Sequence, residues 1–441
     1  PRLLREVARA ICDAVERGDS LGFEARMDAL GRRSTEALRD HLLALAYLQS
    51  GQSGDRLLDL EMAQRLFEEA LALDPELASA HAGLARTWVE MDRLRGEPEL
   101  IVAAIEEAET ALRLAPDLGE ARLLLARLYQ RAGREGEAAA VLDGLTEGLD
   151  SESDGEDSEP ESEEREQVRA LLASAELEID RGDLDEAETL VRQALAIDED
   201  AWDSWSYLGE VEMRRGRDEA AREAFRRAME LGPAQVVPFD NYVLLSLIAG
   251  NSEAAVDAYE AWRGPVDGFL ALNMGTAYYD LGEMEKAEEA YLTAVALEPA
   301  NEIARGNLGD LYRATNREER ARRDYRSALE IVEERLEVFP DNESQRVERI
   351  YASARLGECG PVAEEGPALA GEVAVTYEKM TRLAKAFALC GLEEPAIEAL
   401  ELLAGTGVTL GRVACEDELR SLRGNPGFEA LFAEATATVC E

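Results

Sequence analysis

The sequence predicts an all-α fold, an α-solenoid of about ten helix–turn–helix repeats wound into a right-handed superhelix. Three observations lead to this prediction. A pattern of small and aromatic residues recurs with a period of about 34 residues. Glycine and proline residues fall at equivalent places within each period. The apolar residues are mostly alanine and leucine, and aromatic residues make up only 6% of the chain, which suits helices packed on helices.

The clearest unit spans residues 268–301. Gly282 is expected to end its first helix, where a left-handed residue is needed, and Pro299 is expected to stop its second helix. Between these ends, small and aromatic residues stand at helical spacing and give each helix one packing stripe. The stripes contain Gly275 and Tyr278 on the first helix and Ala287, Tyr291 and Ala294 on the second. One hairpin cannot bury its own apolar face, so copies must stack.

The same pattern flanks this unit on both sides. The upstream copy contains Trp205, Leu208, Gly209, Ala221, Phe225, Ala228 and Pro233. The downstream copy contains Leu308, Gly309, Tyr312, Ala321, Tyr325 and Ala328. Repeats of this length and pattern resemble the tetratricopeptide repeat (TPR) family, and the resemblance implies a solenoid that binds protein partners on the layer formed by its first helices.

The pattern divides the chain into five parts. We expect a helical entry hairpin at 1–36, a first array of about three repeats at 37–146, an acidic disordered linker at 147–166, a second array of about seven repeats at 167–410, and a C-terminal capping helix at 411–441. The repeat at 343–375 looks degenerate, because two Gly-Pro pairs fall inside its expected second helix. The linker consists almost entirely of Ser, Asp, Glu and Gly; it is a plain spacer, a phosphorylation segment or an internal competitor for a basic site.

Three stretches resemble something narrower than the repeat itself. They are Ala63–Ala85, Tyr325–Asn342 and Leu419–Phe432, and they are similar to the C-terminal TPR regions of bacterial serine/threonine protein kinases. The resemblance implies a sensory or docking region whose kinase domain lies upstream of Pro1. The sequence printed here contains no kinase motif.

The net charge of the chain limits the classes of partner that we expect. The formal net charge is −46, from 93 acidic and 47 basic residues. Such a surface repels phosphate backbones and anionic lipids, so we expect no nucleic acid and no membrane partner. The charge either favours a basic protein or peptide ligand, or only keeps an elongated molecule soluble.

The five cysteines show no short pairing and are odd in number; they are Cys12, Cys359, Cys390, Cys415 and Cys440. We therefore expect free, partly buried thiols in a reducing compartment. Because no signal peptide and no apolar run long enough to span a bilayer is present in the sequence, we expect a cytoplasmic location.

The sequence offers little for catalysis. The two histidines, His41 and His81, are each expected on the first helix of a repeat as structural residues, which leaves no usual zinc or metalloprotease spacing. We expect no enzyme activity, no metal and no cofactor in this chain. An enzyme with an unrecognised carboxylate site stays an alternative.

Helical spacing predicts which side chains of the second array line the partner-binding groove. They are Glu210, Arg214, Asn273, Thr276, Asp280, Arg305, Asn307 and Asp310. Asn273 and Asn307 occupy equivalent places, where amides either read the backbone of a bound peptide or only satisfy neighbouring polar groups. Arginines between 313 and 326 form one basic cluster, which is either a solvated face or a docking patch for an anionic partner.

The most economical function is therefore a non-catalytic scaffold for protein–protein interaction. The narrower form is the docking region of a bacterial kinase or a similar signalling protein. The alternative is a free-standing adaptor that organises a secretion or envelope complex.

Overall fold

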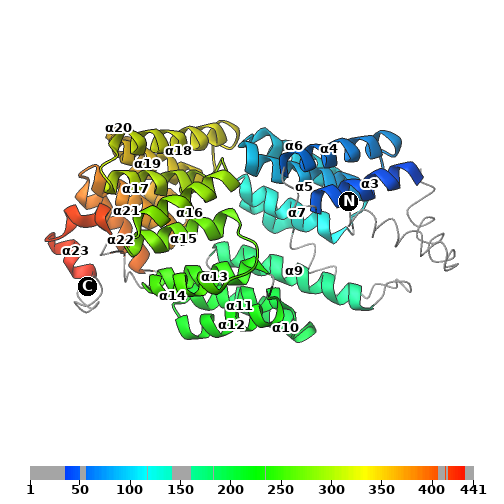
Figure 1. Ribbon diagram of the computed structural model, residues 1–441, viewed down its shortest axis with the longest axis horizontal. Coiled ribbons are helices and arrows are strands. Elements are labelled where there is room, and N and C mark those ends of the chain that lie inside the picture. The colour runs from blue at the N-terminus through cyan, green and yellow to red at the C-terminus, as the bar shows by residue number, and fades with distance from the viewer. Residues whose placement is uncertain are drawn as a thin grey trace. The chain divides into compact units, whose positions relative to one another are not determined.

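A computed structural model describes residues 35–49, 56–116, 118–141, 160–181, 183–233, 235–405, 413 and 416–432. These residues form helices joined by short turns, and none of them lies in a strand (Figure 1). The expected entry hairpin lies outside the described residues except for its last two positions. The chain divides into two compact units, Pro1–Val141 and Leu142–Glu441.

The first unit holds three hairpins of the expected kind. Its helices are α3 (Thr35–Gln49), α4 (Arg56–Leu73), α5 (Ala78–Arg95), α6 (Glu99–Leu114) and α7 (Gly119–Arg131), followed by a helical stretch at 135–141. Its core includes Phe67, which is fully buried and lies against Gly83.

The second unit contains a longer series of hairpins. Its helices are α9 (Pro160–Arg181), α10 (Leu184–Ile197), α11 (Trp202–Arg214), α12 (Asp218–Leu231), α13 (Val236–Ile248), α14 (Ser252–Ala261), α15 (Gly268–Asp280), α16 (Met284–Leu297), α17 (Glu302–Ala314), α18 (Glu318–Val338), α19 (Glu343–Leu356), α20 (Cys359–Glu372), α21 (Tyr377–Leu389), α22 (Glu393–Gly405), the 3-10 helix η2 (Asp417–Leu422) and α23 (Pro426–Leu431). Helix α9 begins at Pro160, so the last seven residues of the expected linker are helical; its part at 147–159 lies outside the described residues.

The turn inside each hairpin needs one left-handed residue. Gly282 has φ 74° after α15, as the sequence predicts, and Gly216, Gly250 and Gly391 have similar values. Asn316 takes the same place after α17 with φ 56°. Asparagine tolerates this conformation better than other residues with a side chain, so the turn is kept without glycine.

The predicted packing stripes form the core of the second unit. The small and aromatic residues on the second helices, such as Ala287, Tyr291 and Ala294, are at most 3% exposed. The glycine on each first helix makes room for the ring: a Cβ added to Gly275 would overlap the ring of Tyr291, and one on Gly309 would overlap that of Tyr325. The sequence prediction of close helix contact at these places is confirmed.

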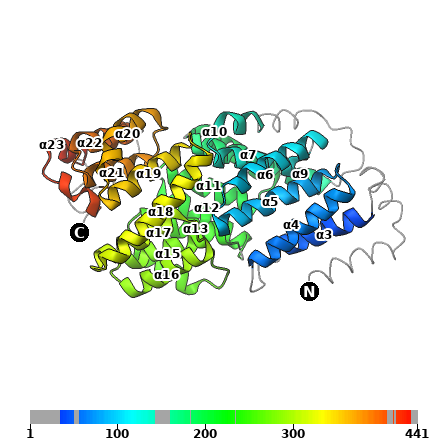
Figure 2. The same ribbon diagram turned by 90° about the horizontal axis from the view of Figure 1, so that it is seen from above.

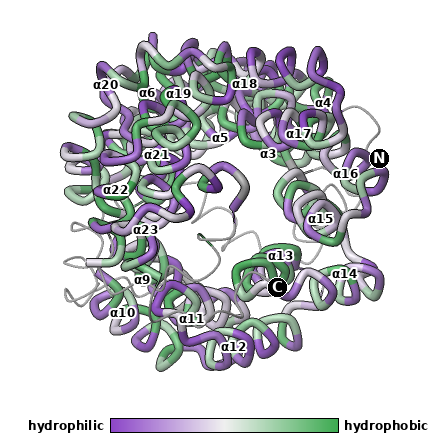
Figure 3. Tube along the Cα trace, turned by 90° about the vertical axis from the view of Figure 1, so that its left-hand side faces the viewer, coloured by the Kyte–Doolittle hydropathy of each residue, from purple (hydrophilic) through white to green (hydrophobic). Residues whose placement is uncertain are grey.

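The helices of the second unit form two layers. Helix α13 packs against α11 and α15, and α15 packs against α17, whereas the second helices of successive repeats make few or no contacts with one another. Figure 3 shows α13 and α15 on the inner side of α14 and α16, and α13 as a mainly hydrophobic helix. We call the exposed side of the first helices the inner face.

The repeat at 343–375 is a regular hairpin, so the expected degeneracy is wrong. Pro361 falls in the first turn of α20, where a backbone N–H has no partner within the helix. Pro367 lies inside α20 and removes one backbone hydrogen bond. Packing compensates for this loss, because Val362 and Leu369 of the same helix are buried in the core that α19 to α23 share.

The expectation of free thiols is wrong for two of the five cysteines. Cys359 and Cys390 form a disulfide with a Cα–Cα distance of 5.5 Å. They are 31 residues apart, close to one repeat, so stacking brings the start of α20 beside the end of α21. No local spacing signals such a pair. Cys12, Cys415 and Cys440 lie outside the described residues.

The C-terminal cap is built differently from the single helix that the sequence predicts. Two short elements, η2 and α23, follow α22 and lie beside α21 and α22 (Figure 2). Their residues Leu419, Leu422 and Phe428 are at most 3% exposed and belong to the same core as α19 to α22. Over the described part of the chain, we find no helix that combines the length and apolarity needed to cross a bilayer.

Candidate functional site

Two neighbouring first helices present unusual side chains on the inner face. One stripe of α13 carries Val237, Asp240, Leu244 and Ile248, and one stripe of α15 carries Phe269, Asn273, Thr276 and Asp280. We call these eight residues the open segment. In a chain with a net charge of −46, its largest exposed side chains are apolar: Val237, Ile248 and Phe269 are 51%, 49% and 45% exposed.

Local contacts hold the two helices in place. Phe239 on the opposite side of α13 stacks on Trp262, with ring centroids 4.2 Å apart and an interplanar angle of 9°. The Trp262 indole N–H donates to the Pro265 carbonyl at 2.9 Å, which fixes the chain between α14 and α15. Asp267 then caps α15 by accepting from the backbone N–H of Leu270 at 2.9 Å. These contacts tie α13 to the turn before α15 beneath the open segment.

One polar pair joins the two helices within this apolar surface. The Asn273 amide donates to Oδ1 of Asp240 at 2.8 Å. Burial raises the pKa of Asp240 to about 7, the Asn273 hydrogen bond lowers it, and the charge of Asp267 raises it. Asn273 thus satisfies a neighbouring carboxyl group, which is the alternative that the sequence left open for this residue.

The other predicted residues on α11 and α15 also make contacts within the protein. Glu210 and Arg214 form an ion pair of 3.0 Å along α11. Thr276 donates to the Leu272 carbonyl and accepts from the Tyr291 hydroxyl at 3.2 Å. Asp280 accepts from the Ser252 hydroxyl at 2.9 Å, which ties α15 to the start of α14.

The three predicted residues on α17 differ from these. Arg305 turns toward its own hairpin, where Nε donates to the Pro299 carbonyl at 3.2 Å and the guanidinium lies 3.8 Å from Asp324. Asp310 accepts from the hydroxyl of Tyr325 and from Arg313 and Arg355, so both of its oxygens have partners within the protein. The Asn307 side chain is half-buried and makes no hydrogen bond to another described residue.

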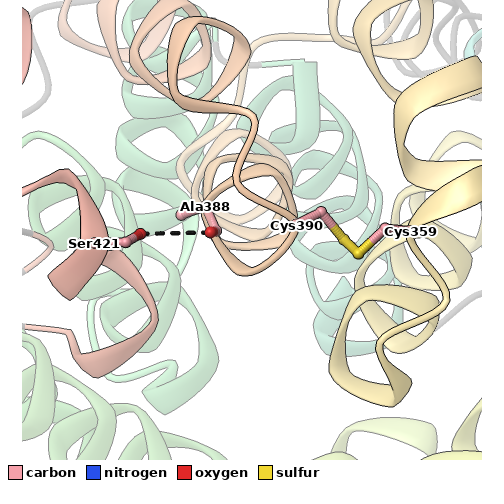
Figure 4. Close-up of a disulfide and its surroundings, with 4 residues drawn as sticks. All are labelled: Cys359, Ala388, Cys390 and Ser421. Carbon is pink, nitrogen blue, oxygen red and sulfur yellow. Dashed lines mark hydrogen bonds between the residues drawn. A yellow bond between two sulfur atoms is a disulfide. The ribbon is translucent and has the colours of Figure 1, made fainter.

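At the other end of the array the chain covers its own inner face. Glu416, just before η2, pairs with Lys385 of α21, and Glu418, within η2, accepts from the Tyr351 hydroxyl of α19 at 3.3 Å. The Ser421 hydroxyl donates to the Ala388 carbonyl at 3.4 Å, two residues before the disulfide (Figure 4). We call Tyr351, Arg355, Lys385 and Ala388, covered by 416–422, the closed segment.

A buried arginine strengthens the closed segment. The Arg355 side chain is 6% exposed, pairs with Asp310 of α17 at 2.6 Å and lies 3.9 Å from the centroid of the Tyr351 ring. Its guanidinium occupies the space beside Gly306, where a Cβ would clash with it. Although burial lowers it, the charge of Asp310 raises the pKa of Arg355, so the arginine stays ionised.

Sequence reasoning found Asn273, Thr276 and Asp280 but missed the apolar residues and Asp240 beside them. A signal was present: α13 carries only one charged residue in a chain whose charged residues amount to 32%. The closed segment had no such signal, because the contact between η2 and α19 joins residues 67 apart.

The remaining polar clusters are structural. His41 is buried against Phe67, and burial lowers its pKa to about 4. His81 contacts Glu107 and the Pro75 carbonyl, which raise its pKa although burial lowers it. Each arginine of the cluster at 313–326 lies within 4 Å of a carboxylate, as a solvated face requires. Within the described ranges, no group of three or more His, Cys, Asp or Glu is placed to hold a metal ion.

Comparison with known proteins agrees with this architecture. A family model described as the middle TPR-like domain of cilia and flagella-associated protein 70 matches residues 168–333. The chain is a solenoid of tetratricopeptide-type repeats. The human protein O-mannosyl-transferase TMTC3 is 24% identical over 297 residues, which cover 64% of this chain and 30% of that protein.

Two solved structures align with much of this chain at low sequence identity. A tetratricopeptide repeat protein from Parabacteroides merdae covers 63% of this chain and 99% of its own, with 16% identity and a TM-score of 0.45. The human IFIT1 dimer with PPP-AAAA covers 80% of this chain and 70% of its own, with 18% identity and a TM-score of 0.40. The expectation that this chain binds no nucleic acid stays a prediction.

Proposed function

We propose that this TPR solenoid is a non-catalytic protein-interaction scaffold whose open segment holds a segment of a partner protein. The observation that carries the proposal is the exposure of Val237, Ile248 and Phe269 on two adjacent first helices of the inner face. Exposed apolar side chains gathered at one place mark interaction surfaces in proteins that are otherwise charged. The proposed binding site is limited to α13 and α15, because residues 416–422 of the chain itself already cover α19 and α21.

The alternative of an enzyme with a carboxylate site has less support. Asp240 is a carboxyl group whose pKa is raised to about 7, as a general acid or base requires. Its hydrogen-bond partner among the described residues is the Asn273 amide, and no second acid, base or nucleophile stands at hydrogen-bond distance from it. The pair therefore fits binding better than catalysis.

The narrower proposal is that the scaffold serves as the docking region of a bacterial serine/threonine kinase or a similar signalling protein. It is supported only by the resemblance of the three stretches named above, and a free-standing adaptor is its alternative. Sequencing the source gene upstream of the codon for Pro1 tests it: an in-frame kinase domain supports the docking region, and another coding context removes it.

The scaffold function is tested by a pull-down from lysate of the source cells, quantified by mass spectrometry. The groove variant Val237→Ser/Phe269→Ser removes the exposed apolar side chains of the open segment. We expect it to lose partners that the wild type retains, while circular dichroism shows unchanged helicity.

The matched control is Leu292→Ser/Leu297→Ser on α16, which removes two apolar side chains that are similarly exposed, at 46% and 39%, on the outer layer. We expect this variant to keep the same partners. Partners that survive in the groove variant, or that disappear equally from both, would contradict a binding site at the open segment.

A further inference from the structure

The open segment contains a feature that a purely apolar docking surface would not need. Asp240 lies one turn after Val237 and one turn before Leu244, and Asn273 faces it from α15, one turn after Phe269. A half-buried carboxyl group thus stands in the middle of apolar side chains. Placing it there costs desolvation free energy that a leucine would not.

The contacts of Asp240 leave one oxygen available. The hydrogen bond from Asn273 uses Oδ1, and Oδ2 has no hydrogen bond among the described residues. Oδ2 is not fully buried, so part of its surface is exposed to solvent. Along α13, Val237 precedes Asp240 by one turn, and Leu244 and Ile248 follow it, so apolar side chains lie before and after the carboxyl group on the same stripe.

Charge complementarity indicates what this arrangement fits. The Asn273 amide stabilises the ionised carboxylate, and no cation of this chain pairs with it among the described residues. A lysine or arginine has an apolar stem and a charged end, so it can lay the stem on apolar neighbours and bring the charge to the carboxylate. An acidic side chain would bring a second negative charge to Asp240, and a purely apolar one would cover Oδ2 without giving it a hydrogen bond.

We propose that the open segment binds a basic, apolar protein segment and that Asp240 accepts a hydrogen bond from one lysine or arginine side chain of that segment. This inference rests on the scaffold function proposed above and names its ligand class. The stripe from Val237 to Ile248 is about 16 Å long at 1.5 Å per residue, so it matches roughly five residues of extended chain. One cation with a large apolar residue on each side fits that length.

The ionisation of Asp240 makes the inference testable by pH. Facing it from α15 and its N-cap are Asn273 and Asp267; no charged side chain of α11, α12 or α14 interacts with it among the described residues. With a pKa near 7, the carboxyl group is mostly protonated at pH 6 and mostly ionised at pH 8. Cation binding needs the ionised form, so affinity should rise as the pH rises.

The first experiment is a selection of random 12-residue peptides by display on the full chain. On the wild type we expect Lys or Arg to be enriched severalfold between large apolar residues. On Asp240→Asn, which keeps the size of the side chain, we expect the apolar positions to persist and the Lys or Arg enrichment to vanish. A preference for acidic residues, or the same basic preference on both proteins, would overturn the inference.

The second experiment measures the affinity of one selected peptide, N-acetylated and free of histidine, at pH 6 and pH 8. We expect up to about a tenfold gain at pH 8 for the wild type and no gain for Asp240→Asn, since the ionised fraction rises from about one tenth to about nine tenths. Glu285→Gln on α16, at the outer layer, removes the same charge elsewhere and should keep the gain. A gain in all three proteins would show that only the net charge matters and would refute the role of Asp240.

The two proposals fail differently. If no selected peptide loses binding in Val237→Ser/Phe269→Ser, the open segment is not a docking site and the scaffold function fails there. If the peptides do lose binding in that variant but bind Asp240→Asn as tightly as the wild type at pH 8, the docking site stands and the cation contact alone is wrong.

Discussion

The open and closed segments of the second unit are built on the same repeat and end up with opposite roles. In both, first helices line the inner face, and their residues follow the same helical spacing. On α13 and α15 these positions expose Val237 and Phe269, whereas on α19 and α21 they hold Tyr351 and Lys385, which contact the chain's own residues 416–422. The comparison teaches that repeat register places a residue on the inner face but does not make it available to a partner.

The largest expected effect comes from a substitution that disrupts the packing of α16 against α15, the helix that carries half of the open segment. Ala287→Arg should lower the free energy of unfolding of the second unit by about 4 kcal/mol or more, because a long charged side chain enters a fully buried contact between α15 and α16. Urea unfolding followed by circular dichroism measures it. Leu292→Arg, at a position 46% exposed on the same helix, should stay within about 0.5 kcal/mol of the wild type; equal losses for the two would refute the assigned packing.

The next largest loss of stability is expected from a substitution in the closed segment alone. Arg355→Ala removes the buried one of the two cations that pair with Asp310, together with its contact to the Tyr351 ring, and should cost about 3–5 kcal/mol. Denaturant unfolding of the full chain measures this loss of stability. In buffer without denaturant, the selected peptides should still bind the open segment of the variant. Arg322→Ala, whose side chain is 67% exposed on α18, is the control and should change stability by less than about 1 kcal/mol. A loss below that level for Arg355→Ala would mean that the buried pair does not hold α17 to α19.

The disulfide gives an effect of somewhat smaller size, also at the closed end. Replacing Cys359 and Cys390 by serine should lower the free energy of unfolding by roughly 3–4 kcal/mol, as expected for a cross-link that closes a loop of about 30 residues. Reduction of the wild type with dithiothreitol should produce the same shift. The double serine variant serves as the control, since dithiothreitol should not change it; a wild type that ignores the reductant would show that the bond is absent in solution.

The smallest expected loss of stability comes from the turn after α15, which can be compared with the equivalent turn after α17. Gly282 has φ 74° and open space around its Cα, so Gly282→Ala should cost about 1–2 kcal/mol from backbone strain alone. Gly282→Asn should cost less, because the equivalent turn after α17 already uses Asn316 in this conformation. Thermal melting compares the two variants, and an alanine variant as stable as the wild type would contradict the strain argument.

Much of the fold could be predicted because its causes are local. Small residues such as Ala287 and Gly275 recur at fixed spacing, and the spacing alone says which helix faces must meet. The prediction of a degenerate repeat at 343–375 was wrong because it considered Pro361 and Pro367 alone. The packing of α20 against its neighbours stabilises the helix in spite of them. A local breaker predicts the end of a helix only where no core compensates for the lost hydrogen bond.

The candidate site could be predicted only in part. Helical spacing placed Asn273, Thr276 and Asp280 on the face where α15 carries them, but it also placed Arg305 there, and that side chain turns toward Asp324. The length and flexibility of an arginine let it choose among several neighbours, so the position of its Cα does not fix where its charge lies.

By itself, the sequence determined the period, the packing stripes and the acidic character of this protein, because each depends on residue type and spacing along one helix or hairpin. Only the tertiary structure decided that Cys359 meets Cys390, that residues 416–422 cover α19 and α21, and that Asp240 pairs with Asn273. Each of these contacts joins side chains about one repeat or more apart. Their formation depends on how successive hairpins stack, and the residue pattern within a single repeat does not determine which side chains of different repeats meet.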